Sequence, residues 1–442
     1  MMERLKDVKK FFICSTNSCL ERIVDCQRIN DYLVANSWRS VDNPTTADLI
    51  IVSTCSLTSD EDESSADYIR FYLSKKAKKA DIIIAGCMPI IAPDKFHQLG
   101  EFLSVAPSNL EALDKIVKAK IKFNAIKEPN ILSVSKFHKM LFKKWLKARK
   151  AVRKFLESFS FRKEFFAGCI YGFKKQISSL GLIKTGIDPF LVDSRNDFFY
   201  LKISRGCLSK CSYCAIRFAT GRLKSRDSET IISDFKKGLR KGSKKFYLVT
   251  EDAGCYGLDI GTTIVELLQK IFREGNDYDF KVIISNFNAQ WLVKYYDQIE
   301  KIIVDNREKI FCFQVPVQSG SNKILCSMNR PYNIEEVKRC ICTLKKKTSP
   351  MAITTDIIVG FPGEQEEDFL MTKDLMEEIG FDFANIFVFQ NRQNTAAYNL
   401  GGKVSQEVTQ RRVSQLEKIQ KSNSKTGLVV KKAIELLKDF YA

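Results

Sequence analysis

Three cysteines near the middle of the chain, Cys207, Cys211 and Cys214, form a C-x3-C-x2-C arrangement. They follow the apolar run 198–203, which predicts a buried strand, so their loop would leave the strand's carboxyl end, where α/β folds place chemistry. Three thiolates can hold three irons of a cubane [4Fe–4S] cluster and leave the fourth iron open. An open iron can chelate the amino and carboxylate groups of S-adenosylmethionine (SAM) and pass one electron into its sulfonium.

Two other interpretations of this triad are a zinc site and three inert buried thiols. A zinc site normally supplies a fourth Cys or His at matched spacing, and the neighbouring sequence contains none. The spacing of the three cysteines, and the aromatic residue Tyr213 before the last of them, therefore favour a cluster. These features resemble the radical-SAM superfamily.

A second set of cysteines, Cys19, Cys55 and Cys87, lies in the first quarter of the chain. Each follows within a few residues of a short apolar run that predicts a strand, at 11–14, 48–52 and 81–85. In a parallel sheet the loops after these strands emerge on one edge, so three separate cysteines can converge there. We expect a second [4Fe–4S] cluster at this edge. Cys14, at the end of a predicted strand, and Cys26, within a predicted helix, compete with Cys19 for the first ligand position.

The composition narrows the classes of protein to which the chain can belong. With 442 residues, 45% hydrophobic and 28% charged, the chain is long enough for two or three globular domains. No apolar run is long enough to span a bilayer and the start lacks a signal-peptide core, so we expect a cytoplasmic protein without membrane association. Fourteen cysteines then indicate thiols and metal rather than disulfides. The only histidines, His97 and His138, disfavour histidine-based catalysis, and the net charge of +19 favours a polyanionic partner such as RNA.

Alternating strand and helix patterns predict an α/β fold in two parts. Residues 1–123 read as an open parallel-sheet, flavodoxin-like domain, and residues 197–402 as a partial (β/α)6 barrel with six repeating units. Between them, 124–196 is a basic linker, and its segment 136–163 has apolar residues at roughly helical spacing. This helix would either touch RNA or pack between the domains. Residues 403–442 read as a polar helical tail with no pattern long enough for a further β-barrel.

Polar or glycine-rich loops follow several of the predicted barrel strands. Carboxylates there can take ribose hydroxyls or an ammonium group, and glycines let backbone amides approach a ligand closely. Their common place at the barrel mouth predicts a SAM pocket. The residues we expect to line it are Tyr213, Glu251, Asp252, Gln318, Asp356 and Gly360.

With these residues identified, nearly the whole chain resembles the radical-SAM methylthiotransferases of the MiaB/RimO type. The most specific matches are the segments 53–56, 85–89, 315–321 and 355–364. The stretch 250–262 is most similar to the archaeal and eukaryotic branch, which acts on N6-threonylcarbamoyladenosine at position 37 of tRNA. The resemblance implies that Cys19, Cys55 and Cys87 hold an auxiliary [4Fe–4S] cluster, and the family register through Asp25 favours Cys19 over Cys14.

The resemblance also implies the reaction. One SAM would methylate a sulfur on the auxiliary cluster, and a second would be cleaved at the Cys207, Cys211 and Cys214 cluster to a 5′-deoxyadenosyl radical. That radical would abstract hydrogen from an unactivated C–H, and the carbon radical would capture the methylthio group. The implied partners are tRNA, a flavodoxin- or ferredoxin-type electron donor and a sulfur donor.

The sequence departs from the family at four places. Ser18 replaces the usual glycine before the first cysteine, 217–220 replaces Pro-x-x-Arg, and 390–395 keeps only Arg392 and Thr395 of the Pro-Arg-x-Gly-Thr region. The usual C-terminal TRAM domain, a small RNA-binding barrel, is not recognisable. These departures leave two alternatives beside a tRNA substrate: the same chemistry on a protein or peptide side chain, or a non-catalytic family member that binds RNA or a partner.

Overall fold

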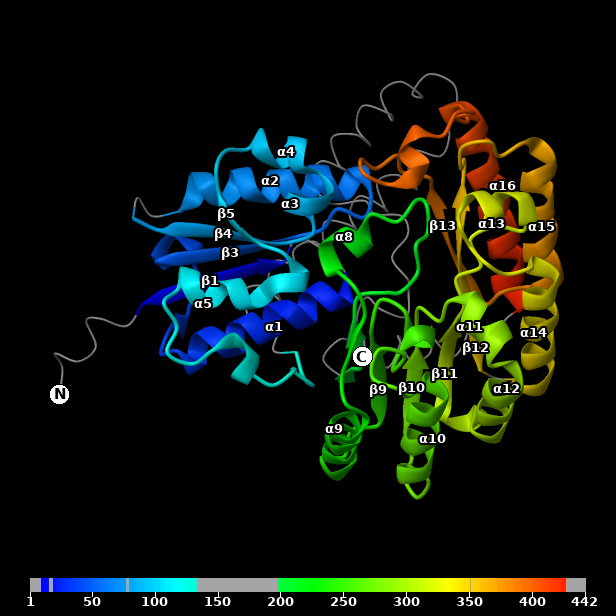
Figure 1. Ribbon diagram of the computed structural model, residues 1–442, viewed down its shortest axis with the longest axis horizontal. Coiled ribbons are helices and arrows are strands. Elements are labelled where there is room, and N and C mark those ends of the chain that lie inside the picture. The colour runs from blue at the N-terminus through cyan, green and yellow to red at the C-terminus, as the bar shows by residue number, and fades with distance from the viewer. Residues whose placement is uncertain (1–8, 16–18, 77–78, 133–197, 350, 427–442) are drawn as a thin grey trace, which may run out of the picture. The chain divides into compact units, whose positions relative to one another are not determined.

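The computed structural model of the chain forms two compact units, residues 1–187 and 188–442, which are described here one by one (Figure 1). The four-part division of the sequence stays a prediction, because most of the basic linker lies outside the described residues. The described residues are 9–15, 19–76, 79–132, 198–349 and 351–426.

The first unit is built on a five-stranded parallel sheet in the order β2-β1-β3-β4-β5. This is the strand order of flavodoxin-like folds, so the predicted open parallel sheet is confirmed. Two short edge strands, β2 and β5, were not expected from the sequence. The strands are β1 Lys10–Ser15, β2 Arg39–Ser40, β3 Leu49–Thr54, β4 Asp81–Gly86 and β5 Leu103–Val105.

Helices cover both faces of this sheet, as Figure 1 shows. Successive side chains of a strand point to opposite faces, so Phe11 packs in the core beneath α1 and α5, whereas Phe12 packs in the core beneath α2. The helix α2 begins at a cap, where the Thr58 hydroxyl accepts a hydrogen bond from the Glu61 amide. The helices are α1 Leu20–Ala35, α2 Ser59–Lys75, α3 Met88–Ile91, α4 Pro93–His97 and α5 Leu113–Ile116, with 3-10 turns η2 Pro44–Thr46, η3 Pro107–Ala112 and η4 Phe123–Ala125.

The second unit contains a six-stranded parallel sheet in the order β13-β12-β11-β10-β9-β6. Each strand pairs with the next along this order, so the sheet is an open six-unit barrel and the predicted (β/α)6 architecture is confirmed. Because all strands are parallel, their carboxyl ends lie at one edge. The strands are β6 Phe199–Lys202, β9 Lys245–Val249, β10 Lys281–Ile284, β11 Ile310–Gln314, β12 Ala352–Val359 and β13 Phe383–Val388.

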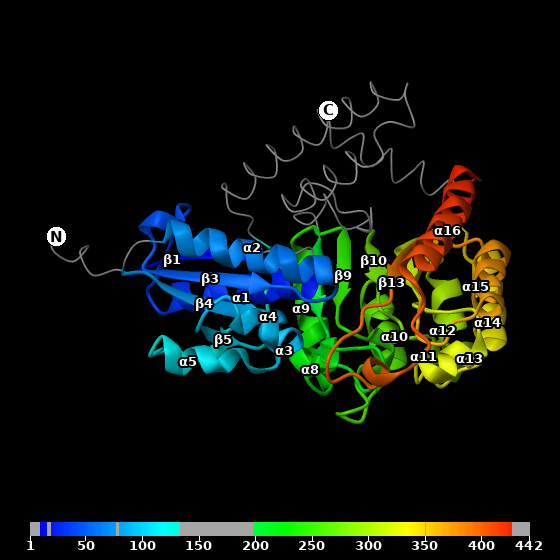
Figure 2. The same cartoon turned by 90° about the horizontal axis from the view of Figure 1, so that it is seen from above.

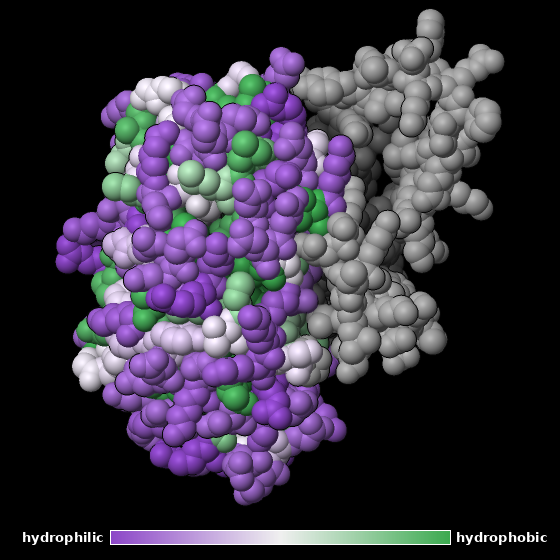
Figure 3. Space-filling model, turned by 90° about the vertical axis from the view of Figure 1, so that its right-hand side faces the viewer, coloured by the Kyte–Doolittle hydropathy of each residue, from purple (hydrophilic) through white to green (hydrophobic). Residues whose placement is uncertain are grey.

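A layer of helices packs against the outside of this sheet (Figure 2). Helix α10 illustrates why these helices pack on the sheet. Its apolar residues, from Ile264 to Phe272, recur at helical spacing and are buried in the core. The opposite faces of such helices are polar, and the surface over α14 and α15 is mostly hydrophilic with scattered apolar residues (Figure 3). The helices are α8 Ile216–Thr220, α9 Ser228–Arg240, α10 Ile264–Glu274, α11 Ala289–Lys294, α12 Tyr296–Asp305, α13 Asn322–Ser327, α14 Ile334–Lys347, α15 Glu366–Ile379 and α16 Gln406–Thr426.

The helix α16 lies in the segment that the sequence predicts as a polar tail. It packs against β13, β12 and α15, and Leu416 is fully buried in the barrel core. The polar remainder of its described surface explains why the sequence pattern reads as a solvated helix. In the part of the chain that the structure describes, no helix is both long and apolar enough to cross a membrane.

Candidate functional site

The predicted cysteine loop leaves the carboxyl end of β6, as expected. A short antiparallel ribbon, β7 Ser204–Arg205 with β8 Lys224–Ser225, closes the base of the segment that carries the three cysteines and α8. Gly206 has φ +76°, and a Cβ there would lie 2.3 Å from the carbonyl oxygen of Arg222. Only glycine therefore fits at the point where the loop turns away from the ribbon. The Gly206 amide donates to Oε2 of Glu251 at 2.9 Å, which brings the predicted SAM residue Glu251 beside the loop.

The loop is anchored by segments that come much later in the chain. The Ser212 amide donates to the carbonyl of Met328 at 2.9 Å, and its hydroxyl donates to the carbonyl of Ser327 at 2.7 Å. From the segment after β13, the Ala397 amide donates to the Ser212 carbonyl at 2.8 Å. The chain around Ser212 is thus fixed from two sides, by the end of α13 with the residue that follows it and by the η7 turn, Ala396–Asn399.

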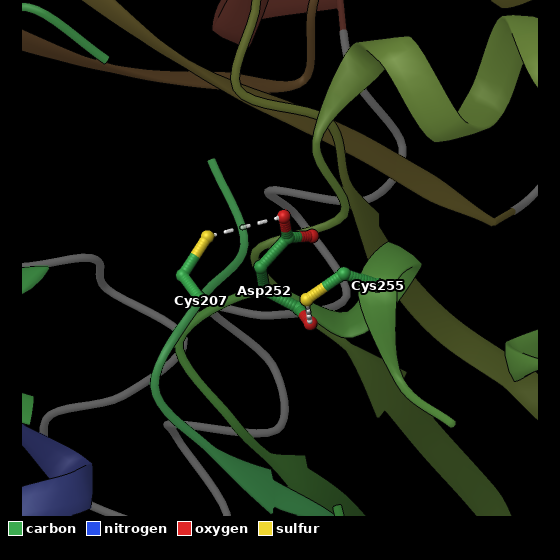
Figure 4. Close-up of side chains that lie close together, drawn as sticks. All are labelled: Cys207, Asp252 and Cys255. Carbon is green, nitrogen blue, oxygen red and sulfur yellow. Dashed lines mark hydrogen bonds between the residues drawn. The ribbon is translucent and has the colours of Figure 1, made fainter. Parts of the chain in front are cut away.

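Cys207 lies beside a carboxylate and another thiol (Figure 4). Its Sγ donates to Oδ2 of Asp252 at 3.5 Å, and the ligand atoms of Cys207, Asp252 and Cys255 all lie within 4.8 Å of one another. The Ser209 amide also donates to Cys207 Sγ, at 3.2 Å. The sequence assigned no role to Cys255, because its spacing matches no ligand pattern. Only the fold of the loop after β9 brings it to Cys207.

The Asp252 carboxylate is almost fully buried and accepts several hydrogen bonds from the protein itself. The indole of Trp291 donates to Oδ2 at 3.2 Å, and the amides of Gly254 and Asn288 donate to Oδ1 at 3.1 and 3.4 Å. Burial raises the pKa of Asp252, although the charge of Arg330 and the hydrogen bonds from Asn288 and Trp291 oppose the rise. The carboxylate thus ties the loop after β9 to α11 and to the cysteine loop. Its expected contact with SAM stays a prediction.

A buried arginine that the sequence did not single out lies next to Tyr213. Nε and Nη2 of Arg330 donate to the Tyr213 hydroxyl at 3.2 and 2.6 Å, and the guanidinium lies 5.8 Å from the ring centroid. Its positive charge lowers the pKa of Cys211, opposing the effect of burial. The buried Nη1 has no hydrogen-bond partner among the described residues. A lone arginine before a proline gives no signal in one sequence, so only the structure identifies it.

Polar side chains form a hydrogen-bonded row across the carboxyl half of the barrel sheet. The row includes two contacts to the predicted SAM residue Asp356, whose Oδ1 accepts from Gln314 at 3.0 Å and from Asn385 at 2.8 Å. Burial raises the pKa of Asp356, and these two donors oppose the rise. Each strand of the sheet, or the segment that follows it, contributes one member, and Asn286 joins the row through the backbone carbonyl of Thr250. The members are Ser204, Thr250, Asn286, Gln314, Asp356 and Asn385.

The remaining two predicted SAM residues also lie at this edge and have positive φ. Gln318, at φ 67°, bonds through its backbone to β12: its amide donates to the Asp356 carbonyl and its carbonyl accepts from the Ile358 amide. Gly360, at φ 79°, donates its amide to Oε2 of Glu364 at 2.8 Å. The structure therefore places five of the six predicted residues in loops that follow barrel strands, and the sixth, Asp356, within β12.

The three loop thiols differ in their proton affinity. Burial raises the pKa of Cys214 to about 11 and also raises the pKa of Cys211. The pKa of Cys207 is instead lowered, chiefly by a hydrogen bond from Cys255. Cys207 is therefore the loop thiol that loses its proton most readily.

In the first unit, Cys19, Cys55 and Cys87 lie at the carboxyl edge of the sheet. Cys19 precedes α1, Cys55 follows β3, and Cys87 follows β4 at the start of α3. Burial raises the pKa of Cys19 well above its ordinary value, and the nearby Cys55 and Cys87 add to the rise. The structure thus brings the three predicted cysteines together.

The approach of β3 and β4 explains the position of Cys87. Gly86 has φ +113°, and a Cβ there would lie 2.3 Å from the carbonyl oxygen of Thr54, so the two strand ends meet more closely than another residue would allow. The Cys87 amide donates to the same Thr54 carbonyl at 3.1 Å. Cys55, the next residue after Thr54, is thereby fixed beside Cys87.

Cys14 and Cys26, which compete with Cys19 for the first ligand position, lie in different surroundings. Cys14 is buried in the core beneath α2, where it hydrogen-bonds with Tyr72, and burial raises its pKa to about 12. Cys26 lies on α1 and is hydrogen-bonded to Ser53, and burial raises its pKa to about 11. The cysteines among the main causes of the Cys19 shift are instead Cys55 and Cys87.

A buried arginine also lies near this second triad. Arg22 is 2% exposed and pairs with Asp25 at 3.2 Å. Its charge lowers the pKa of Cys19, as the charge of Arg330 does for Cys211. Each set of three thiols therefore has one buried cation nearby, which favours the thiolate form and a group of net negative charge.

Both triads offer three thiols and no imidazole. A single zinc ion requires its sulfur ligands about 2.3 Å from one centre, whereas a cubane separates its thiolates by irons and sulfides. Of the described side chains, only Cys207, Asp252 and Cys255 form a ligand group of three within 4.8 Å, and neither triad is that compact. Together with the buried arginines, the donor sets therefore fit two [4Fe–4S] clusters.

Two family models match the chain. The Radical SAM superfamily matches residues 201–376, and Uncharacterized protein family UPF0004 matches residues 11–105. These ranges cover the cysteine loop with most of the barrel, and the sheet of the first unit.

Curated proteins of similar sequence fall into one enzyme class. The chain is similar to the "Probable threonylcarbamoyladenosine tRNA methylthiotransferase" of Pyrococcus horikoshii, with 29% identity over 86% of this chain and 76% of the relative. The protein of the same name from Pyrococcus abyssi is 30% identical over 80% of this chain and 71% of the relative. The ribosomal protein uS12 methylthiotransferase RimO of Thermotoga petrophila is 33% identical over 54% of this chain and 56% of the relative.

Among solved structures, a radical S-adenosylmethionine methyltransferase from Kitasatospora setae, with cobalamin and a [4Fe–4S] cluster bound, has a similar fold. The TM-score is 0.57 at 11% identity, over 88% of this chain and 74% of that chain. At this identity the likeness concerns the fold alone.

Proposed function

Because the chain belongs to the radical-SAM methylthiotransferase family, we propose that it inserts a methylthio group at C2 of N6-threonylcarbamoyladenosine at position 37 of tRNA. The chain is an enzyme of this class, and the family uses SAM and [4Fe–4S] clusters. Support for this substrate comes from the names of the two Pyrococcus relatives, which print threonylcarbamoyladenosine and tRNA.

The observation that carries methylthiotransfer is the second triad. The barrel and Cys207, Cys211 and Cys214 would serve any radical-SAM reaction. A sulfur-inserting enzyme also needs a place to hold the sulfur that it transfers. The thiols of Cys19, Cys55 and Cys87 at the sheet edge offer three ligands to such a group and leave one metal position for the sulfur.

In this proposal the three thiols of the barrel loop bind one [4Fe–4S] cluster, which when bound supplies the electron for reductive cleavage of SAM. Glu251 lies beside the loop and can accept a hydrogen bond from the ammonium group of SAM. Asp356 and Gln318 lie on β12 and its neighbouring loop, where they can bind polar groups of the adenosine part of SAM. Arg330 holds Tyr213 in place and places positive charge beside Cys211. No side chain has to act as a general base, which suits a chain with two histidines.

The electron and the sulfur must come from outside the chain. We propose a flavodoxin- or ferredoxin-type protein as the electron donor. A separate sulfur donor would reload the auxiliary cluster after each turnover.

Cys19, rather than Cys14, is expected to be the first auxiliary ligand. Cys19→Ser should lose the auxiliary cluster, because one of its three thiolates is gone, yet should still form 5′-deoxyadenosine at the barrel loop. Cys14→Ser is the matched control and should keep the iron content of the wild type, since Cys14 is a core thiol bonded to Tyr72. Iron analysis and chromatography of the SAM products distinguish the two, and the reverse pattern would make Cys14 the ligand.

The substrate is tested by mass spectrometry of nucleosides from tRNA, in cells with and without the protein. We expect 2-methylthio-N6-threonylcarbamoyladenosine only where the wild-type chain is present, and none with the Cys207→Ala variant. An unchanged nucleoside profile would refute the tRNA proposal.

A protein side chain is the second candidate, because the uS12 methylthiotransferase of Thermotoga petrophila is 33% identical to part of this chain. Proteomic mass spectrometry of the same cells would then find a mass increase on a protein that depends on Cys207. That result, with unmodified tRNA, would favour the protein substrate over the nucleoside.

A further inference from the structure

An open pocket lies beside the cysteine loop of the barrel, and none of the residues assigned above lines it. Its volume is about 520 Å³. One wall is Arg217 of α8, three residues after Cys214. The other wall is the segment after β13, which supplies Gln393, Asn394, Thr395, Tyr398 and Asn399.

The pocket is joined to the cysteine loop by the backbone. Ala397, in the middle of the second wall, donates its amide to the Ser212 carbonyl inside the loop. Arg217 follows the same loop without a break, in the helix that begins at Ile216. In Figure 2 the segment after β13 passes next to α8. A molecule in this pocket would therefore lie next to the site where the loop places its chemistry.

The pocket favours an anionic ligand, because Arg217 is the one charged residue among the described residues of its lining. The segment 205–226 contains six basic residues and no aspartate or glutamate, and the segment 389–403 also contains no acid. The Arg217 guanidinium stacks over the Phe218 ring at 4.6 Å, and its buried Nε has no hydrogen-bond partner among the described residues. Guanidinium groups bind phosphate in two-pronged hydrogen bonds, so Arg217 is suited to one. The six residues are Arg205, Lys210, Arg217, Arg222, Lys224 and Arg226.

The other polar groups suit a nucleobase. Side-chain amides bind the edges of bases in two-pronged hydrogen bonds, and the pocket holds three of them, at Gln393, Asn394 and Asn399. Exposed aromatic rings stack on unpaired bases. Tyr398 in the pocket is 40% exposed, and Phe218, under the Arg217 guanidinium, is 36% exposed.

Asn394 links the pocket to a departure noted in the sequence. It stands where the family's Pro-Arg-x-Gly-Thr region has glycine, and its φ is 64°. Asparagine is among the few residues that tolerate this left-handed conformation. The chain thus keeps the backbone shape that glycine would allow and adds an amide to the pocket.

We propose that this pocket binds an unpaired nucleotide of the RNA substrate, next in sequence to the nucleotide that is modified. Arg217 binds its phosphate, Tyr398 stacks on its base, and Asn394 reads the edge of the base. The proposal rests on the proposed tRNA substrate and adds that the pocket contributes to the choice of RNA. A peptide from a ribosomal protein is disfavoured as the ligand. Such peptides carry basic side chains, and the described residues of the pocket lining include an arginine and three side-chain amides but no carboxylate to pair with them.

The test uses the reconstituted full-length protein and fluorescence polarisation with two RNAs. One is a hairpin with an anticodon stem and loop, and the other is a fully paired duplex with the same number of nucleotides. The pocket variant is Arg217→Gln with Tyr398→Leu. The control makes the same changes at the opposite edge of the barrel sheet, as Arg273→Gln with Tyr278→Leu, where Tyr278 is 44% exposed.

The pocket variant should bind the hairpin about 5- to 150-fold more weakly, the range expected for one stacked base. The slope of its binding against salt should fall by about 0.7, as for one lost phosphate contact on a single strand. Its affinity for the duplex, and both affinities of the control, should equal those of the wild type. Asn394→Gly should also weaken hairpin binding, and it keeps the backbone conformation. Formation of 5′-deoxyadenosine by every variant separates lost RNA binding from damage to the cysteine loop.

Three results would overturn the proposal. If the wild type modifies tRNA but the pocket variants bind the hairpin as tightly as the wild type does, the role of the pocket is refuted and the tRNA substrate stands. Equal losses on hairpin and duplex would reduce its role to general charge. If the wild type does not bind the hairpin and transfers the methylthio group to a protein, both the RNA substrate and the nucleotide-binding role of the pocket are refuted.

Discussion

Replacing Cys207, Cys211 and Cys214 together with alanine is expected to abolish reductive cleavage of SAM and to leave about half of the iron. Without these thiolates no iron at the barrel loop can be held and chelate SAM. The auxiliary triad belongs to the other compact unit and keeps its three ligands. After anaerobic reconstitution we expect about eight iron atoms per wild-type chain and about four in the variant. Iron analysis and the absence of 5′-deoxyadenosine measure the two effects.

A matched control replaces two cysteines for which the fold gives no ligand role. Cys326 is exposed and Cys342 is half-buried on α14. Cys326→Ala with Cys342→Ala should keep all the iron and the full rate of SAM cleavage. A triple variant without any iron would refute the auxiliary site, and one with undiminished iron would refute the assignment of the barrel loop.

The largest loss of stability is expected from Arg412→Met. Nη1 of Arg412 pairs with Oε2 of Glu364 at 2.7 Å, with 3% and 1% of the two side chains exposed. The same carboxylate accepts the amide of Gly360, so the pair joins α16 to the loop after β12. Removing the cation leaves a buried, uncompensated carboxylate, which costs about 3–5 kcal/mol. Urea titration of the wild type and the variant measures the difference in the free energy of unfolding.

The neighbouring arginine provides the control. Arg411 is 55% exposed and pairs with Glu366, so Arg411→Gln should cost less than about 1 kcal/mol. Equal losses in the two variants would contradict the role of burial. The pH dependence gives a second check: burial raises the pKa of Glu364 and Arg412 opposes the rise. Without Arg412 this pKa rises further, so the variant's deficit should be smallest in acid, where Glu364 is protonated in both folded and unfolded chains, and should grow as the pH rises.

Much of the fold could be predicted from the sequence because each main strand is a compact apolar run. Runs such as 49–52 and 246–249 are apolar and buried on both faces, so they stand out without any alternation. The edge strands β2 and β5 could not be found in this way. Arg39 and Ser40 carry no apolar signal, and β5 has only three residues. The helix α16 was predicted, but its packing was not, because Leu416 is the one apolar residue among the buried side chains of its described part and the others, Thr409 and Arg412, are polar.

Parts of the site could likewise be predicted from the sequence, and other parts could not. The three loop cysteines lie close together in the sequence, so their spacing alone indicates a cluster. The contact between Arg330 and Tyr213 joins residues 117 positions apart, and the approach of Cys255 to Cys207 depends on the loop after β9. For Asp252 the sequence predicts a carboxylate at a strand end. Only the structure reveals that this carboxylate already accepts hydrogen bonds from two backbone amides and one side chain. Contacts between distant segments are set by the tertiary fold, and a single sequence contains no pattern for them.

The anchoring of Ser212 has a consequence for biogenesis. The loop that contains it is translated with the first barrel strand, but its partners Met328 and Ala397 are translated much later. Domains fold as units while the ribosome adds residues one by one, so the nascent loop has no fixed geometry until the segment around Ala397 has left the exit tunnel. Iron delivered earlier would meet three unpositioned thiols. We therefore expect cluster insertion into the barrel to follow translation of the segment around Ala397, so that the machinery that assembles the cluster meets a nearly finished barrel rather than a short nascent loop.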